Sequence, residues 1–333
     1  MRSFVLFLIL LFWGGCSSYE KGRSVTVYVS EDQVFSEPIL RDFERETGIR
    51  VDALYDTEES KSTGVMNRLI AEKRNPRADV YWANEPIRAE VLRQKGILAP
   101  YASPAAEGIA PIFMEKSHYW TGFSARIRLL LVHDGAGSDP DSILAYADPA
   151  YRAKAVIANP LFGTTTSHIA ALFTLWGDEK AKTFLNRLKA NAVAISTSNG
   201  ESADFVAQGR YRFALVDSDD AISRIRRKAP VHIVYPDQKA GEAGVFVVPN
   251  AVMMIAGAPH PEAARKLIDY LLSRGTERKL AFADCAQIPL HPGVQMPQAL
   301  KPISQLHVMQ VDYAAVARKL EQIQPWLKQW LER

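Results

Sequence analysis

Three carboxylates lie within four residues of one another, at Asp217, Asp219 and Asp220. They follow a short apolar run at residues 213–216, which is typical of a buried strand. Ionised carboxylates this close repel one another, and a helix beginning here would stabilise one or two of them by capping and through its dipole. A bound hard cation would also relieve the repulsion, because oxygen ligands suit such ions. Capping and cation binding both stay open for Asp219 and Asp220, whereas capping is favoured for Asp217.

A second polar segment comes where a helix is expected over residues 167–176. Gly163 is followed there by Thr164, Thr165 and Thr166. Free backbone N–H groups and the dipole at a helix start favour an anion, and glycine lets a ligand approach closely. A threonine that merely caps the helix is the alternative. The segment alone fits both interpretations equally.

Polar turns also follow other predicted strands. Because the carboxyl ends of parallel strands meet at one edge of an open α/β sheet, ligands bind there, and we expect these turns to line a ligand site. The turns contain Ser30, Glu31 and Asp32, residues 56–59, Asn84 and Glu85, and residues 196–199 ending at Asn199.

Two arginines, Arg126 and Arg128, lie in a long apolar stretch at residues 122–133. One of them is expected to point toward the ligand as a counter-charge or clamp, since guanidinium groups bind acidic groups well. An arginine on an exposed edge strand is the alternative.

The sequence excludes several kinds of chemistry. It has no phosphate-binding P-loop, no H-E-x-x-H motif and no G-x-S-x-G motif. Only two cysteines occur, which rules out a thiolate zinc site, and the seven histidines are scattered. A net charge of +3 without a long basic run argues against a nucleic-acid partner. No catalytic residues and no cofactor are therefore expected.

Strands and helices are predicted to alternate along the chain, which indicates an α/β fold with parallel strands covered by helices. The 333 residues exceed what one core usually holds, so we expect two lobes. Strands are predicted at residues 245–248 and 251–256, where the chain returns to the first lobe. The first lobe is expected over residues 24–121 and 250–310, the second over 122–249, and a C-terminal helix over 311–333.

The first residues have the pattern of a secretion signal. Arg2 is followed by an unbroken apolar run at residues 4–13 and by small residues before Cys16. The run is too short to span a bilayer, which takes roughly 20 residues. The arrangement resembles a bacterial lipobox and predicts a signal peptide over residues 1–15, lipidation of Cys16 and a tether over 16–23. An ordinary signal peptide with an incidental cysteine is the alternative.

Several segments together resemble the type II solute-binding proteins of ABC importers, and most closely their ferric-iron-binding subgroup. The resemblance implies two α/β lobes joined by two crossing strands, which close on a ligand. It rests on VTVYV at residues 25–29, FERETGIRV at 43–51, PRADVYW at 76–82, NPLFGTTTS at 159–167, FALVDSDD at 213–220 and AQIPL at 286–290.

The resemblance also implies roles for residues. Ferric members hold the metal with a histidine or acidic residue after the first strand, a glutamate after the third and two adjacent tyrosines in the second lobe. By position these fall on residues 30–32, on Asn84 beside Glu85, and on Asp219 and Asp220. The chain has no two adjacent tyrosines. A synergistic anion would meet residues 163–166, with help from Asp217.

We therefore expect an exported, lipid-anchored receptor in the periplasm or at the cell surface. It would capture a small ligand, ferric iron or a related metal foremost, and deliver it as a monomer to a permease with a cytoplasmic ATPase. Glu31, Glu85, Asp219 and Asp220 are the expected metal ligands. A binder of phosphonate, phosphate or an organic cation is the alternative, and an exported metal-dependent hydrolase or a ligand sensor is the alternative from another class.

Overall fold

The computed structural model of the chain describes residues 24–56, 63–135 and 137–332. The predicted signal peptide, Cys16 and the tether lie outside these residues, as do residues 57–59 of one expected polar turn. Among the described helices, none is both long and apolar enough to cross a membrane.

The first lobe is built on parallel strands around β1 (Ser24–Val29). β1 pairs in parallel with β2 (Arg50–Tyr55) on one side and with β3 (Val80–Ala83) on the other. Helices cover both faces of the sheet, so the valines of β1 are fully buried. The helices and short strand that follow these strands are α1 (Gln33–Thr47), α2 (Thr63–Ala71), α3 (Pro86–Gln94) and β4 (Leu98–Ala99).

The second lobe repeats this alternation around β8 (Phe213–Asp217), which pairs in parallel with β6 (Ala155–Ala158). β6 pairs in turn with β7 (Ala194–Ser196). The remaining elements of this lobe are α4 (Gly163–Trp176), α5 (Asp178–Ala190), α6 (Asn199–Ala207), α7 (Ser218–Arg226) and β9 (Val231–Val234).

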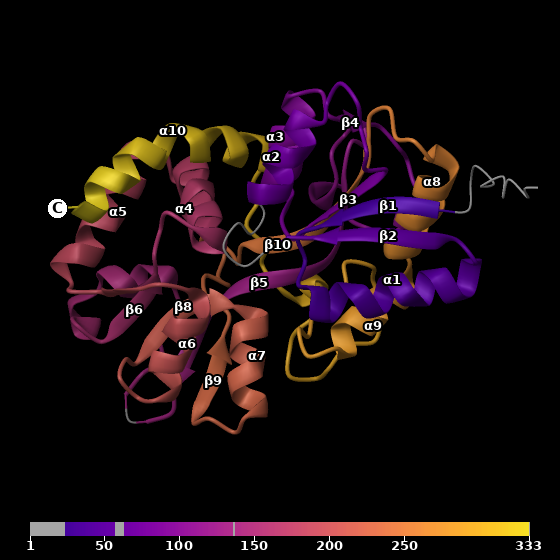
Figure 1. Ribbon diagram of the computed structural model, residues 1–333. Helices are drawn as coiled ribbons and strands as arrows, with labels where there is room; N and C mark the ends of the chain where they lie inside the picture. The colour runs from indigo at the N-terminus through magenta and orange to yellow at the C-terminus, as the bar shows by residue number, and fades with distance from the viewer. Residues whose placement is uncertain (1–23, 57–62, 136, 333) are drawn as a thin grey trace, which may run out of the picture.

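Two long strands join the lobes, β5 (Thr121–His133) and β10 (Val247–Ile255), and they lie antiparallel at the centre of Figure 1. The described strands form one sheet in the order β2-β1-β3-β10-β5-β8-β6-β7. The prediction of separate strands at 245–248 and 251–256 is wrong. β10 runs through Pro249 and Asn250 with only a shift of register against β5.

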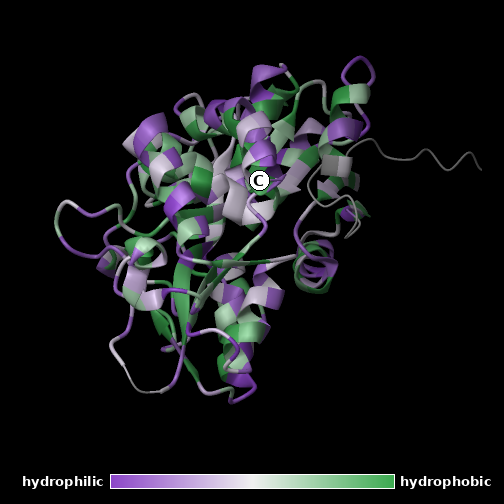
Figure 2. Cartoon of the chain, turned by 90° about the vertical axis from the view of Figure 1, so that its left-hand side faces the viewer, coloured by the Kyte–Doolittle hydropathy of each residue, from purple (hydrophilic) through white to green (hydrophobic). Residues whose placement is uncertain are grey.

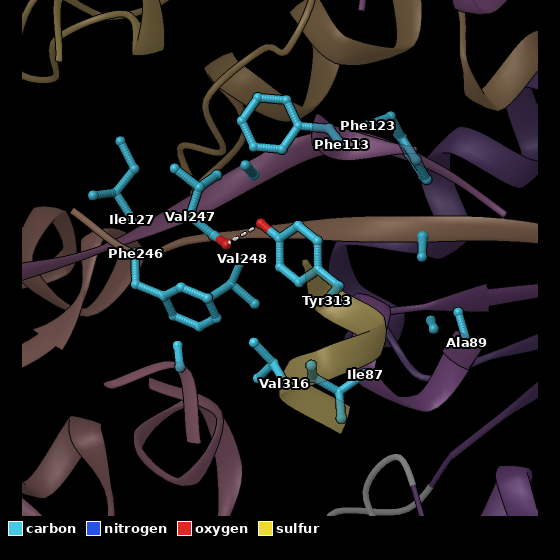
Figure 3. Close-up of a cluster of buried hydrophobic side chains, with 14 of the residues drawn as sticks. Ile87, Ala89, Phe113, Phe123, Ile127, Phe246, Val247, Val248, Tyr313 and Val316 are labelled. Atoms are coloured by element: carbon cyan, nitrogen blue, oxygen red, sulfur yellow. Dashed lines mark hydrogen bonds between the residues drawn. The ribbon is translucent and has the colours of Figure 1, made fainter. Parts of the chain in front are cut away.

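The C-terminal part packs across both lobes. In Figure 1, α10 (Tyr313–Glu332) runs from beside α3 to beside α4, and its proline is tolerated within the helix. The Tyr313 hydroxyl donates to the carbonyl of Val247 at 2.7 Å, and Figure 3 shows Phe246, Val316 and Ile87 packed around it. In Figure 2, the strands inside the molecule are mostly hydrophobic, and the helices carry hydrophilic residues on their outer faces. The other segments are α8 (Pro261–Leu271), α9 (Arg274–Phe282) and the 3₁₀ turns η2 (Pro104–Ala106), η3 (Pro111–Phe113), η4 (Ile143–Ala147), η5 (Pro149–Tyr151) and η6 (Ile303–Gln305).

Candidate functional site

The three aspartates at the start of α7 lie together. One side-chain oxygen from each of Asp217, Asp219 and Asp220 falls within 4.8 Å of the others. Burial raises the pKa of Asp219 to about 6, and the Asp217 carboxylate adds to this while Arg126 opposes it. The pKa of Asp220 is raised well above its usual value by burial and by the charge of Asp219. In the absence of a cation, these two carboxylates therefore cost the folded protein free energy when ionised.

Asp217 is held by the protein itself. Its two carboxylate oxygens accept from Arg128 Nη1 at 3.1 Å and from the Thr164 hydroxyl at 2.7 Å. Arg128 is fully buried and also donates to Thr165 Oγ1 at 3.1 Å. Asn199 Nδ2 donates to Thr164 Oγ1 at 2.9 Å. This buried network ties together the starts of α4, α6 and α7, so these side chains position the site's elements.

Arg126 is the arginine that faces the carboxylates of both lobes. It is half-buried, donates to the backbone carbonyl of Asn84, and its Nε has no hydrogen-bond partner among the described residues. Although burial disfavours its charge, the pKa of Arg126 is raised, because acidic groups surround it. They are Glu31, Asp219, Asp217 and Glu85.

The acidic residues of the first lobe have defined partners. The buried Glu31 accepts from Gln287 Nε2 at 2.9 Å. Glu85 precedes α3 and accepts from the Ser167 hydroxyl of α4 at 2.8 Å, a buried hydrogen bond that joins the two lobes. The Arg88 guanidinium lies 3.4 Å from the other oxygen of Glu85. The structure therefore brings Glu31, Glu85 and Asp219 around Arg126.

Ser30 and Asp32 have more local roles. The Ser30 hydroxyl lies 2.8 Å from the Tyr81 hydroxyl and 3.1 Å from an Asp56 carboxylate oxygen. Asp32 occupies the N-cap position of α1, where its backbone carbonyl accepts from Ser36 at 2.9 Å. Both residues flank Glu31 and fix the turn that presents it.

The start of α4 favours an anion. Its N-cap position is held by Phe162, which is 67% exposed and has no side-chain group to cap the helix. Gly163 has φ of +60°, a conformation that glycine adopts without strain. Thr166 is buried, and its hydroxyl has no hydrogen-bond partner among the described residues. Uncapped N–H groups and an available hydroxyl suit a phosphate or carboxylate group.

Two further residues shape the site, Ser167 and Gln287, and neither was predicted from the sequence. Ser167 ends the threonine segment and could have been recognised as part of the same helix start. Gln287 lies in the AQIPL segment at residues 286–290, whose pattern indicates only the family resemblance. Gln287 and Glu31 are 256 positions apart in the sequence, so no local pattern could link them.

Two α/β lobes joined by two strands, with charged groups of both lobes converging between them, define a two-lobed binding protein. Residues 25–281 match the family of bacterial extracellular solute-binding proteins. The chain belongs to this family, and it is the solute-binding protein of an ABC transporter rather than an enzyme. It is a periplasmic or extracellular protein that binds a small ligand and has a permease as its partner.

Individual relatives differ in ligand. The chain is 25% identical to iron uptake protein A1 of Synechocystis sp., over 82% of this chain and 79% of that protein. It is 24% identical to a putative 2-aminoethylphosphonate-binding periplasmic protein of Salmonella typhi, over 80% and 74%. The structure superimposes on iron-bound HitA from Pseudomonas aeruginosa with a TM-score of 0.80 at 22% identity, covering 91% of this chain and 99% of HitA. This likeness establishes the type II periplasmic-binding-protein fold expected from the sequence.

The raised pKa of Asp219 predicts a pH-dependent stability of the ligand-free protein. The folded protein retains a proton on Asp219 up to about pH 6, whereas the unfolded chain loses it near its usual pKa of 3.8. Stability should therefore fall as the pH rises through this window. Asp219→Asn removes the part of this dependence that Asp219 causes, so its stability relative to wild type should grow by about 1–3 kcal/mol between pH 4 and 7. Urea unfolding at several pH values measures this difference, and a constant difference would contradict the assignment.

Proposed function

We propose that this protein captures a hard, oxygen-loving cation between its lobes, with ferric iron as the leading cargo, and delivers it to an ABC permease with a cytoplasmic ATPase. The observation that carries the proposal is the cluster of Asp217, Asp219 and Asp220. Asp217 and Asp219 surround Arg126 together with Glu31 and Glu85 of the other lobe, whereas Asp220 lies 3.6 Å from the guanidinium of Arg224. Carboxylate oxygens are suitable ligands for hard cations. The relation to an iron uptake protein supports the same cargo.

A cation would resolve the electrostatic conflict at the start of α7. Asp219 and Asp220 hold their protons more tightly than ordinary aspartates because their charges are buried and adjacent. A metal ion would replace those protons, so binding should weaken in acid. Since the proposed ligands are carboxylates, the iron-loaded site should lack the visible colour of tyrosinate–iron coordination. Closure of the lobes would bring Glu31 and Glu85 onto the ion.

A small phosphonate or phosphate is the second candidate. It is favoured by the uncapped start of α4, by the Thr166 hydroxyl and by the guanidinium of Arg126. The relation to a putative 2-aminoethylphosphonate-binding protein supports it, and that ligand also carries an amine that the carboxylates could bind. An organic cation would use the carboxylates alone.

Thermal unfolding of the purified protein with a panel of ligands separates these candidates. The panel contains Fe³⁺ as its nitrilotriacetate complex, inorganic phosphate, 2-aminoethylphosphonate and choline. We expect Fe³⁺ alone to raise the midpoint by several degrees, since a ligand at 100 times its Kd adds about 2.7 kcal/mol. A shift with phosphate or 2-aminoethylphosphonate and none with Fe³⁺ would contradict a metal cargo.

We further propose that the protein is a lipoprotein anchored through Cys16, working as a monomer in the periplasm or at the cell surface. The apolar run at residues 4–13 and the small residues before Cys16 support this. Cys16→Ser should shift the protein from the membrane fraction to the soluble fraction, while ligand binding stays unchanged. Fractionation and labelling with a fatty acid measure this. A membrane-bound variant, together with unlabelled wild type, would contradict lipidation.

A further inference from the structure

The two strands that join the lobes are irregular at one point. β5 and β10 change register between Pro249 and Asn250, opposite Ser124. Ser124 is fully buried and has φ of +38°, a conformation that costs a non-glycine residue free energy. Its backbone is clamped on both sides: the N–H donates to Glu277 Oε1 at 2.9 Å, and the carbonyl accepts from Asn250 Nδ2 at 2.6 Å. We call this point, residues 123–125 with Pro249 and Asn250, the strand bulge.

A chain of buried hydrogen bonds runs from the strand bulge to the ligand site. Trp82 Nε1 donates to Asn250 Oδ1 at 3.1 Å, and Asn250 Nδ2 donates to Gln287 Oε1 at 2.8 Å. Gln287 Nε2 then donates to Glu31 Oε1 at 2.9 Å. Trp82, Asn250 and Gln287 are at most 1% exposed, so water does not compete for these bonds.

The chemistry of these side chains fixes which group donates and which accepts in each hydrogen bond. The Trp82 indole can only donate, so Asn250 must present its oxygen to Trp82 and its NH₂ to Gln287. Gln287 must then present its own oxygen to Asn250 and its NH₂ to Glu31. The Glu31 carboxylate therefore accepts a hydrogen bond whose geometry is set by residues of the strand bulge.

Gln287 is also attached to the bulge through its own backbone neighbours. Ala125 and Ile288 exchange two backbone hydrogen bonds of 2.7 Å each. Ala286, on the other side of Gln287, has φ of +44°, so the backbone is constrained on both sides of Gln287. A change at the strand bulge must therefore move Gln287, and with it the carboxylate of Glu31.

We propose that Gln287 is a positioning residue that couples Glu31 to the strand bulge, so that occupation of the site and the angle between the lobes depend on each other. The inference rests on the proposed function in that Glu31 faces the ligand. Gln287 does not bind the ligand. It holds Glu31 in place for it, and it transmits a displacement of Glu31 to the strands that join the lobes.

Gln287→Met tests this proposal, because methionine has a similar length and can make neither hydrogen bond. Gln238→Met is the matched control: Gln238 donates to the carbonyl of Pro236 at 2.9 Å and accepts from the backbone of His307 at 2.9 Å, away from Glu31 and the bulge. Spin labels on Glu107→Cys and Glu179→Cys, both exposed and on different lobes, report the interlobe distance. Cys16→Ser in all variants, with Cys285 buried, keeps the labelling specific.

We expect Gln287→Met to widen the interlobe distance distribution with and without Fe³⁺, and to raise the Kd for Fe³⁺ at least 10-fold through faster dissociation. Gln238→Met should leave both readouts as in wild type, even where its melting temperature falls. A distance distribution unchanged by Gln287→Met, or one changed equally by both variants, would overturn the proposal. If wild type binds no Fe³⁺, the proposed cargo is refuted, while the ligand-free distance distributions still decide the role of Gln287.

Discussion

Asp219→Asn combined with Asp220→Asn is expected to abolish binding of Fe³⁺, with a loss of at least about 100-fold in affinity. Both proposed carboxylate ligands of the second lobe become neutral amides, which are weak ligands for a hard trivalent cation. The fold should survive, because burial already raises the pKa of both aspartates and thus penalises their charges. We expect the ligand-free variant to melt at a higher temperature than wild type at neutral pH. Equilibrium dialysis against Fe³⁺-nitrilotriacetate measures the affinity.

The control for this variant removes the same charge elsewhere in the second lobe. Asp139→Asn with Asp141→Asn neutralises two exposed aspartates that pair with Arg212 and Lys239 at the surface. It should bind Fe³⁺ as wild type does, which separates a ligand effect from a general change in protein charge. If the double variant at Asp219 and Asp220 also binds Fe³⁺ like wild type, these aspartates only cap α7. The anion candidate centred on Thr164, Thr165, Thr166 and Arg126 would then lead.

Arg128→Met is expected to destabilise the protein by about 3–5 kcal/mol, the largest effect on folding that we foresee. Arg128 is fully buried and donates to Asp217, Thr164, Thr165 and the carbonyl of Leu215. Its removal leaves the carboxylate of Asp217 buried without its counter-charge. Urea unfolding should show a midpoint far below that of wild type.

Two further variants test the reason for this loss. Arg212→Met breaks a partly buried ion pair with Asp139, whose carboxylate is itself 41% exposed, and should cost much less than Arg128→Met. Arg128→Met with Asp217→Leu removes both charges and should recover much of the lost stability, since an apolar pair needs no compensation. A small effect of Arg128→Met alone, similar to that of Arg212→Met, would show that the buried network does not hold the starts of α4 and α7 together.

Local sequence patterns were sufficient for most of the fold. The valine-rich run of β1 is typical of a strand buried on both faces, and Gly48, a residue that often ends helices, is the left-handed C-cap of α1. β10 was predicted as two strands, separated by Pro249 and Asn250. Here the irregular register against β5 accommodates both residues. The error therefore came from a contact between distant segments, which a local pattern does not contain.

The same limit applies to the site. Arg126 and Arg128 lie two residues apart on one strand and so point to the same face, and the sequence could not say which approaches the ligand. The pairing of β5 with β8 decides it, because that register sets Arg128 opposite Asp217. Arg126 lies opposite Val248 instead, and its guanidinium remains near the carboxylates of both lobes.

The most direct test of the proposed cargo is the metal content of the protein at equilibrium with Fe³⁺. The purified protein would be dialysed at pH 7.5 against Fe³⁺-nitrilotriacetate, separated from free metal and analysed by mass spectrometry for iron and protein. We predict about one Fe³⁺ per chain for wild type, without the visible absorption of tyrosinate–iron coordination, and no bound iron for the variant with Asp219→Asn and Asp220→Asn. Wild type that retains no iron, while the same preparation binds 2-aminoethylphosphonate or phosphate, would contradict the metal cargo.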